Sequence, residues 1–216
     1  MFDYKKARKN MVDNQIRPSN VTNRDLLRSL SWVQRENFLY LEHSTLSYSE
    51  TDLRLEDGRN ITNPRLIAKM IDSLKIKKED IVLSISPGLG YSCALMATLC
   101  NLVVAVEREG IAEEAQNRLV EGGFDNVIVI PGEFAQGSVE HAPYDALIIE
   151  GGLEILPENL SNQVKLGGRI VAIFVEGKFG QCNYGIKTQS GIDWKVLFEV
   201  NCPILSEFKN NQEFVF

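Results

Sequence analysis

The chain has 216 residues, of which 44% are hydrophobic, and a formal net charge of −6 at pH 7. Single domains usually span about 50 to 250 residues, so this composition predicts one packed domain, or one domain with a small appendage, and excludes a disordered chain. The acidic balance excludes nucleic acid or an anionic membrane surface as an expected partner, and no apolar run reaches the roughly 18 residues of a membrane span. The first residues also lack the apolar segment of a signal peptide. We therefore expect a cytoplasmic protein, either a monomer or a weak homodimer.

The N-terminal region, residues 1–79, has a helical but irregular pattern. Four apolar residues between Leu26 and Val33 fall on one helical face, and Thr22 or Asn23 can cap the start of that helix. Within residues 1–35 basic residues outnumber acidic ones, and we interpret them as a solvated helix face. These basic residues are Lys5, Lys6, Arg8, Lys9, Arg17, Arg24, Arg28 and Arg35.

A stretch rich in Tyr, Ser and Asp, residues 46–64, is predicted to be a loop. At its end Asn63 can cap a helix whose first position is Pro64, because proline has no N–H to lose there. That helix presents an apolar stripe to the core. The stripe consists of Leu66, Ile67, Met70, Ile71 and Leu74.

From residue 80 onward, apolar runs alternate with helix-length polar segments. This alternation predicts an α/β fold with a mostly parallel sheet and helices on both faces. Two more strand-like segments form a terminal hairpin, which completes seven strands. We expect residues 80–216 to form this domain as one compact unit with residues 1–79. The predicted strands are Ile81–Ile85, Leu102–Val106, Val127–Ile130, Ala146–Ile149, Ile170–Val175, Tyr184–Thr188 and Trp194–Val200; the clear helices are Ile111–Leu119 and Leu160–Lys165, the latter stopped by Gly167 and Gly168.

The most informative stretch is DIVLSISPGLGYS, residues 80–92. Gly88 and Gly90 follow a predicted strand and precede a helix, where glycine lets the backbone approach a ligand closely. The next strand ends on Glu107, a carboxylate placed to accept hydrogen bonds from ribose hydroxyls. Ser86 and Pro87 stand where such loops usually offer another glycine. The layout predicts a nucleoside pocket, and an ordinary solvated Glu107 is the alternative.

Other chemistries receive less support from the residues. A nicotinamide dinucleotide site would need a third loop glycine where Cys93 stands, and no His or Lys is placed for hydride transfer. The four cysteines form no CxxC pair and have no His at ligand spacing, so no metal site is predicted. His43 and His141 lie beside no nucleophile motif, which argues against a catalytic triad. Methyl transfer fits the pocket better.

Over nearly its full length the chain resembles the protein-L-isoaspartate (D-aspartate) O-methyltransferase family, which has the class I methyltransferase fold. The order of the matching segments is more specific than any one motif. The segments are MVDNQIRPSNVTNRDLLRSL (11–30), SYSETDLRLEDGRNITNP (47–64), VLSISPGLGYSCALMA (82–97), VVAVE (103–107), GEFAQGSVEHAPYDALII (132–149) and LSNQVKLGGRIVAI (160–173).

The resemblance implies a cofactor, S-adenosylmethionine, and a peptide or protein substrate carrying an isoaspartyl or D-aspartyl residue. Glu107 would bind the ribose hydroxyls and Glu133 would lie near the adenine. Thr62 would be the active-site hydroxyl between cofactor and substrate, although a helix-entry cap is the alternative role for this residue. The resemblance also implies that Gly88 and Gly90 pass close to the amino-acid part of the cofactor, and that Ser84, Ser86 and Tyr91 belong to the cofactor-binding residues.

The chain departs from the family pattern around the cofactor loop. Ser84 replaces an acidic residue, and Ser86 and Pro87 replace Gly-Thr. Phe134 replaces a glycine, and its ring would either pack on the adenine or fill the adenine space. These changes keep a second hypothesis open, namely a catalytically weakened protein of the same fold that acts as a binding module.

Overall fold

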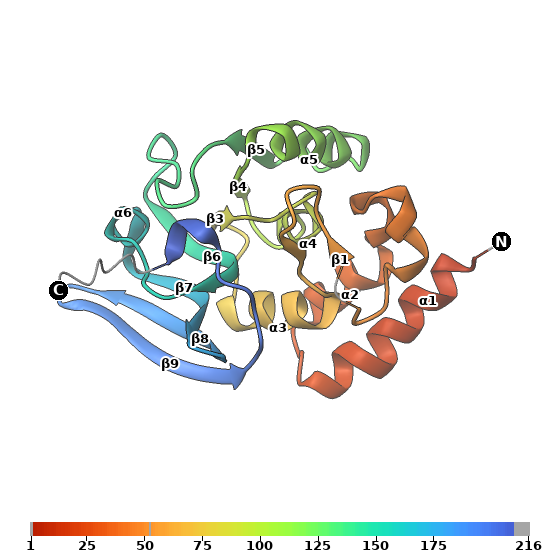
Figure 1. Cartoon of the computed structure of the whole chain (residues 1–216), viewed down its shortest axis with the longest axis horizontal. Helices are drawn as coiled ribbons and strands as arrows, with labels where there is room; N and C mark the ends of the chain where they lie inside the picture. The colour runs from red at the N-terminus through yellow and green to blue at the C-terminus, as the bar shows by residue number, and fades with distance from the viewer. Residues whose placement is uncertain (1, 52, 210–216) are drawn as a thin grey trace.

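A seven-stranded sheet lies at the centre of the computed structural model, which describes residues 2–51 and 53–209 (Figure 1). Five parallel strands are followed by a pair of strands, each antiparallel to the strand before it, in the spatial order β5-β4-β3-β6-β7-β8-β9. The predicted fold class is confirmed. The strands are β3 (Ile81–Ile85), β4 (Leu102–Glu107), β5 (Val127–Pro131), β6 (Tyr144–Leu153), β7 (Val164–Glu176), β8 (Phe179–Thr188) and β9 (Gly191–Glu199).

The two helices predicted before residue 80 form as expected. Asn23 caps α2 by accepting from the Asp25 and Leu26 N–H groups, and Asn63 caps α3 by accepting from Leu66. Within the described ranges, no helix has the length and apolar character needed to cross a membrane. The helices are α1 (Tyr4–Met11), α2 (Arg24–Trp32), α3 (Pro64–Leu74), α4 (Tyr91–Ala97), α5 (Glu109–Glu121) and α6 (Glu158–Asn162), with a π-helix at Val12–Ile16 and 3-10 helices at Arg17–Ser19, Arg35–Phe38, Leu41–Leu46 and Ser206–Phe208.

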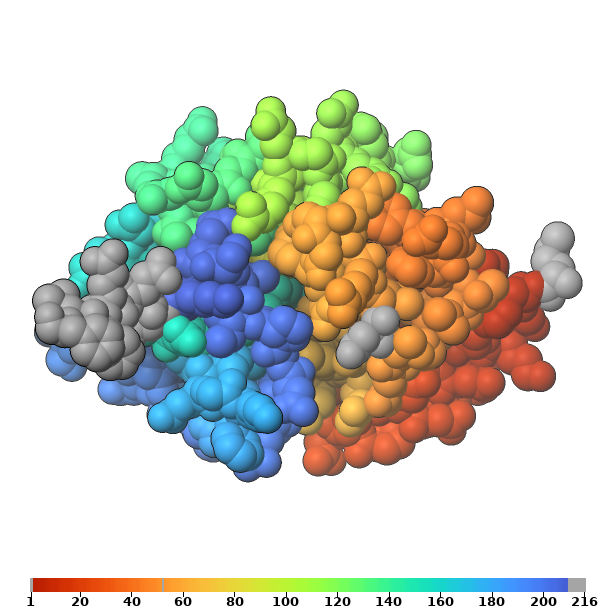
Figure 2. Space-filling view, in the orientation of Figure 1, coloured from red at the N-terminus to blue at the C-terminus, as the bar shows by residue number. Residues whose placement is uncertain are grey.

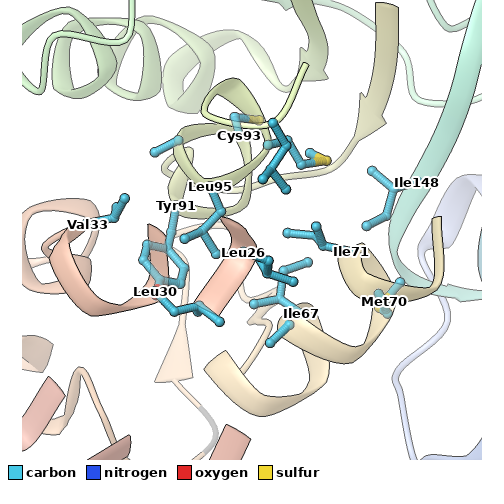
Figure 3. Packing of buried hydrophobic residues seen from close by; sticks show 14 of the residues in the cluster. Leu26, Leu30, Val33, Ile67, Met70, Ile71, Tyr91, Cys93, Leu95 and Ile148 are labelled. Atoms are coloured by element: carbon cyan, nitrogen blue, oxygen red, sulfur yellow. The ribbon is translucent and has the colours of Figure 1, made fainter. Parts of the chain in front are cut away.

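The sheet packs against a different layer on each face. One cluster joins the N-terminal helices to the face that carries Val103 and Ile148, and Figure 3 shows side chains of α2, α3 and α4 meeting there. The other face is covered by α6 and by the segment after β9, which contributes Leu205 and Phe208. The first cluster makes the N-terminal helices part of the main hydrophobic core.

Two local predictions are wrong. Residues 46–64 are not only loop, because β1 (Leu53–Arg54) pairs antiparallel with β2 (Asn60–Ile61) in a short hairpin. The helix predicted over Leu160–Lys165 ends at Asn162, and Gly167 and Gly168 lie inside β7. The cause is tertiary pairing, since Val164 already pairs with Tyr144 of β6.

The basic N-terminal residues do not all lie on a solvated face, which corrects that interpretation. Arg8 is 8% exposed and Arg35 is 2% exposed. The Tyr48 hydroxyl accepts from Arg8 Nη1 and from the Arg35 backbone N–H, each at 3.2 Å, and donates to Glu36. This buried network fastens α1 to the segment that holds Arg35 beneath the candidate site.

Candidate active site

Glu107 ends β4 and is fully buried. Its carboxylate accepts the Gly88 N–H at 2.8 Å and the Arg108 N–H at 2.7 Å. Arg59 adds two contacts, from Nη2 at 2.5 Å and from Nη1 at 3.2 Å. Burial raises the pKa of Glu107, while Arg59 and the two N–H groups act in the opposite direction. The predicted ribose-binding carboxylate is therefore paired with a guanidinium of this chain.

Arg59 belongs to the β1–β2 hairpin and anchors it to the sheet. Its Nε donates to Asp57 at 2.6 Å, and Nη1 also donates to the Ser86 hydroxyl. The guanidinium carbon lies 4.9 Å from the centre of the fully buried Phe134 ring, and that of Arg108 lies 5.1 Å from it. Arg59 thus closes the hairpin over both Glu107 and Phe134.

The loop between β3 and α4 keeps a glycine-like backbone despite its altered sequence. Ser86 has a φ of 62°, in the left-handed region that non-glycine residues rarely adopt, and Gly88 has a φ of 61°. This conformation turns the Gly88 N–H toward Glu107. Ser86 therefore adopts a turn conformation that favours glycine, and it places a hydroxyl beside Arg59.

A cavity of about 490 Å³ opens next to this ion pair. Its two walls are the hairpin segment, residues 57–63, and the segment after β9, residues 201–206. These are the orange and blue segments that meet near the centre of Figure 2. Thr62 and Glu150 line the cavity between these walls. This size is within the range of small-molecule and side-chain binding sites.

A smaller polar pocket lies behind the cavity and shares Thr62 and Glu150 with it. Arg35 and Tyr91 line the pocket, with the Arg35 guanidinium carbon 4.9 Å from the centre of the Tyr91 ring. The Arg35 Nε atom and the Tyr91 hydroxyl oxygen are buried without a hydrogen-bond partner among the described residues. Unpaired buried polar atoms are costly, and the pocket's volume of about 10 Å³ gives room there for about one water molecule.

The structure brings several of the predicted site residues together. Thr62, Ser86, Gly88 and Tyr91 all line the smaller pocket. Thr62 is not the helix cap, because Asn63 fills that role and leaves the Thr62 side chain at the cavity. Gly90 stands at the N-terminus of α4 with a φ of 95°.

Two other predicted residues lie apart from this group. Ser84 is fully buried within β3. Glu133 is exposed on the loop after β5, and its side chain makes no ion pair or hydrogen bond with the described residues. The adenine contact assigned to Glu133 stays a prediction.

The sequence interpretation missed Arg35, Arg59 and Glu150. Glu150 directly follows the predicted strand Ala146–Ile149, and ligands of open α/β sheets bind at the carboxyl ends of strands. That signal was present. Arg59 gave no such signal, because no sequence pattern distinguishes an exposed loop arginine from one that is bound to Glu107.

The sequence profile of the protein-L-isoaspartate (D-aspartate) O-methyltransferase family matches residues 6–196 of the chain. The chain belongs to this family. It is 28% identical over 212 residues to a protein-L-isoaspartate O-methyltransferase of Petrotoga mobilis, covering 96% of this chain and 99% of that protein. It is 34% identical over 172 residues to one of Syntrophus aciditrophicus, covering 79% of each.

Solved structures of the family share the fold. A protein-L-isoaspartate O-methyltransferase structure superposes with a TM-score of 0.80 at 23% identity, covering 92% of this chain and 65% of that one. The putative enzyme of Plasmodium falciparum, solved in complex with S-adenosyl-L-homocysteine, gives a TM-score of 0.76 at 18% identity and covers 95% of this chain and 99% of its own. The resemblance inferred from the ordered sequence segments is thereby confirmed.

Proposed function

We propose that the chain transfers a methyl group from S-adenosylmethionine to the carboxylate of isoaspartyl or D-aspartyl residues in proteins or peptides. Family membership supports this activity. The observation that carries it is the placement of Glu107 and Gly88 at the carboxyl ends of adjacent parallel strands, beside a cavity lined by Thr62.

The residues present match both ends of S-adenosylmethionine in their chemistry, and both ends need a change of conformation to enter. The unpaired Arg35 Nε and Tyr91 hydroxyl are donors for the carboxylate of its amino-acid end, but the pocket that they line with Ser86 and Gly88 has a volume of about 10 Å³ and must widen to admit a carboxylate. Glu107 is an acceptor for ribose hydroxyls. In this structure Arg59 donates to both carboxylate oxygens of Glu107. The nucleoside end of the cofactor can therefore bind only after the Arg59 guanidinium has separated from Glu107.

The side chains of this protein need to supply little acid–base catalysis. The cofactor supplies an activated methyl group on a sulfonium, and the acceptor carboxylate is already ionised near neutral pH, so no general base is required. Thr62 orients the acceptor by a hydrogen bond to one carboxylate oxygen. Positioning of the two reactants then supplies most of the acceleration.

Calorimetric titration with S-adenosylmethionine and S-adenosylhomocysteine tests the cofactor assignment, and no detectable binding at millimolar ligand would reject it. Transfer of a labelled methyl group to an isoaspartyl peptide, compared with its normal aspartyl twin, tests the substrate. We expect label only in the isoaspartyl peptide. Equal labelling of both peptides would refute the substrate class.

One observation favours a second function, a binding module without methyl transfer. Arg59 covers Glu107, and the buried Phe134 ring occupies space beside it, so the chain's own side chains fill the nucleoside end of the site. In that case the isoaspartyl peptide would still bind, but neither cofactor form would. The two titrations above separate the functions.

We further propose a cytoplasmic location and a monomer or weak homodimer, with residues 1–79 supplying the substrate side of the site. The acidic net charge supports a peptide rather than a nucleic acid as partner. Sedimentation at micromolar and near-millimolar concentration would test the assembly. A stable dimer at micromolar concentration would contradict it.

A further inference from the structure

Glu150 is a buried acid at the centre of the site. It lies in the last part of β6, is 7% exposed, and lines both the large cavity and the smaller polar pocket. The Ser92 hydroxyl donates to its Oε1 atom. Thr62 lines the same two spaces, so an acceptor held by the Thr62 hydroxyl also meets Glu150.

The surroundings of Glu150 leave its charge poorly compensated. Within residues 2–51 and 53–209, no Lys or Arg nitrogen lies within ion-pair distance of its carboxylate. Burial raises the pKa of Glu150 to about 7; Ser92 opposes this, the nearby Glu107 carboxylate adds to it, and Arg35 and Thr62 oppose it. The buried thiol of Cys93 on α4, whose pKa burial also raises, is another titratable neighbour. Tyr91 lines the smaller pocket with Glu150, and Asp57, Arg59 and Arg108 line the large cavity with it.

A carboxyl group in such a place acts differently in its two protonation states. The neutral acid has an O–H that can donate to an incoming carboxylate, whereas the ionised form only accepts hydrogen bonds. Two carboxyl groups at hydrogen-bond distance cannot both be ionised without a large cost, and they share one proton instead. An acceptor carboxylate entering beside Glu150 therefore selects its protonated state.

We propose that Glu150 is the residue that recognises the acceptor, by donating its carboxyl proton in a hydrogen bond to one oxygen of the acceptor carboxylate. This inference rests on the proposed function, because it assumes a carboxylate acceptor in the cavity. The other acceptor oxygen forms the new bond to the methyl carbon while the carbon–sulfur bond breaks and its electrons return to sulfur. The proton stays on Glu150, and the product is a neutral ester.

The proposal predicts the direction of a pH effect on substrate affinity. At pH values well below 7 most Glu150 side chains are protonated, and an isoaspartyl peptide binds. As the pH rises above 7, the ionised Glu150 must take up a proton before the peptide can bind. The affinity for the peptide therefore falls by up to tenfold for each pH unit. The effect belongs in KM and in the peptide Kd rather than in kcat.

The test is the Kd of a fluorescent isoaspartyl peptide for the whole chain, measured by anisotropy at pH 6 and pH 8 with and without S-adenosylhomocysteine. We expect the wild type to bind at least fivefold more weakly at pH 8. The variant Glu150→Gln, which keeps a donor and cannot ionise, should bind about equally at both values. Glu113→Gln on the exposed face of α5 is the matched control and should retain the wild-type pH dependence.

The outcomes separate this inference from the proposed function. Equal wild-type affinity at both pH values overturns the role of Glu150 while leaving the function intact, and it requires no variant. A pH dependence that persists in Glu150→Gln overturns it as well. Tighter wild-type binding at pH 8 would show that an ionised Glu150 faces a cationic acceptor, which also refutes the proposal. No peptide binding at any pH, with or without S-adenosylhomocysteine, would instead reject the proposed substrate.

Discussion

Replacement of Arg59 by glutamine should tighten the binding of S-adenosylmethionine. In the present conformation both oxygens of Glu107 are held by the Arg59 guanidinium, at 2.5 and 3.2 Å. A ribose can reach those oxygens only after this pair has separated. Arg59 therefore competes with the cofactor from within the chain, and glutamine removes the charge while retaining a polar side chain.

The size of the effect follows from the contact that must be broken. A hydrogen bond to a charged group contributes about 1.5 to 3 kcal/mol net. Each 1.4 kcal/mol is about tenfold in Kd, so Arg59→Gln should lower the cofactor Kd by roughly 10- to 100-fold. The same change leaves a buried carboxylate without its guanidinium. The free energy of unfolding of the ligand-free variant should therefore be about 3 kcal/mol or more below that of the wild type.

The assay is calorimetric titration of both proteins with S-adenosylhomocysteine, together with thermal unfolding with and without ligand. Arg54→Gln is the matched control, because Arg54 is an exposed arginine on the same hairpin. We expect it to leave the cofactor Kd unchanged. An equal or weaker affinity in Arg59→Gln would refute the competition and show that the guanidinium contributes to cofactor binding.

Three further outcomes are expected. Glu107→Ala should weaken cofactor binding by at least about 1 kcal/mol, measured by the same titration, because a charge-assisted acceptor is lost; an unchanged affinity would remove Glu107 from the ribose role. Tyr48→Phe should lower the free energy of unfolding in urea by about 1 to 3 kcal/mol, because Arg8 and the Arg35 N–H lose their acceptor; an unchanged midpoint would contradict this. Glu150→Gln should stabilise the chain at pH 8 but not at pH 4. The Glu150 carboxyl has a pKa of about 7 in the folded chain against an ordinary 4.5, so the free energy of unfolding of the wild type falls as the pH rises through that interval. The gain should reach about 3 kcal/mol at about 1.4 kcal/mol per pKa unit, and equal stability at pH 8 would refute it.

The central fold could be predicted because its signals are local and repeated. The strand Ile81–Ile85 is predicted by a short run of mostly apolar and β-branched residues, and the cap Asn63 by a side chain that accepts from a backbone N–H three residues later. The errors occurred where a distant partner decides the outcome. Val164 joins a strand because Tyr144 lies opposite it, and the β1–β2 pair forms over only two residues on each side.

The candidate site follows the same division. Glu107 and Gly88 were predictable, since a strand end and a glycine turn have recognisable spacing. The partner of Glu107 was not, because Arg59 lies 48 positions away and reaches it only through the hairpin. The positive φ of Ser86 was equally hidden, although Ser86 performs the turn that a glycine would usually provide.

The ion pair at Glu107 and the proton on Glu150 are linked through their charges. The Glu107 carboxylate raises the pKa of Glu150, and Arg59 offsets part of that negative charge while it stays bound. When the hairpin releases Glu107 to neutral ribose hydroxyls, the uncompensated charge favours the protonated form of Glu150, which is the form that binds an acceptor carboxylate. Arg59→Gln should therefore move the pH midpoint of peptide binding upward. A midpoint identical to that of the wild type would mean that cofactor entry and acceptor recognition are electrostatically independent.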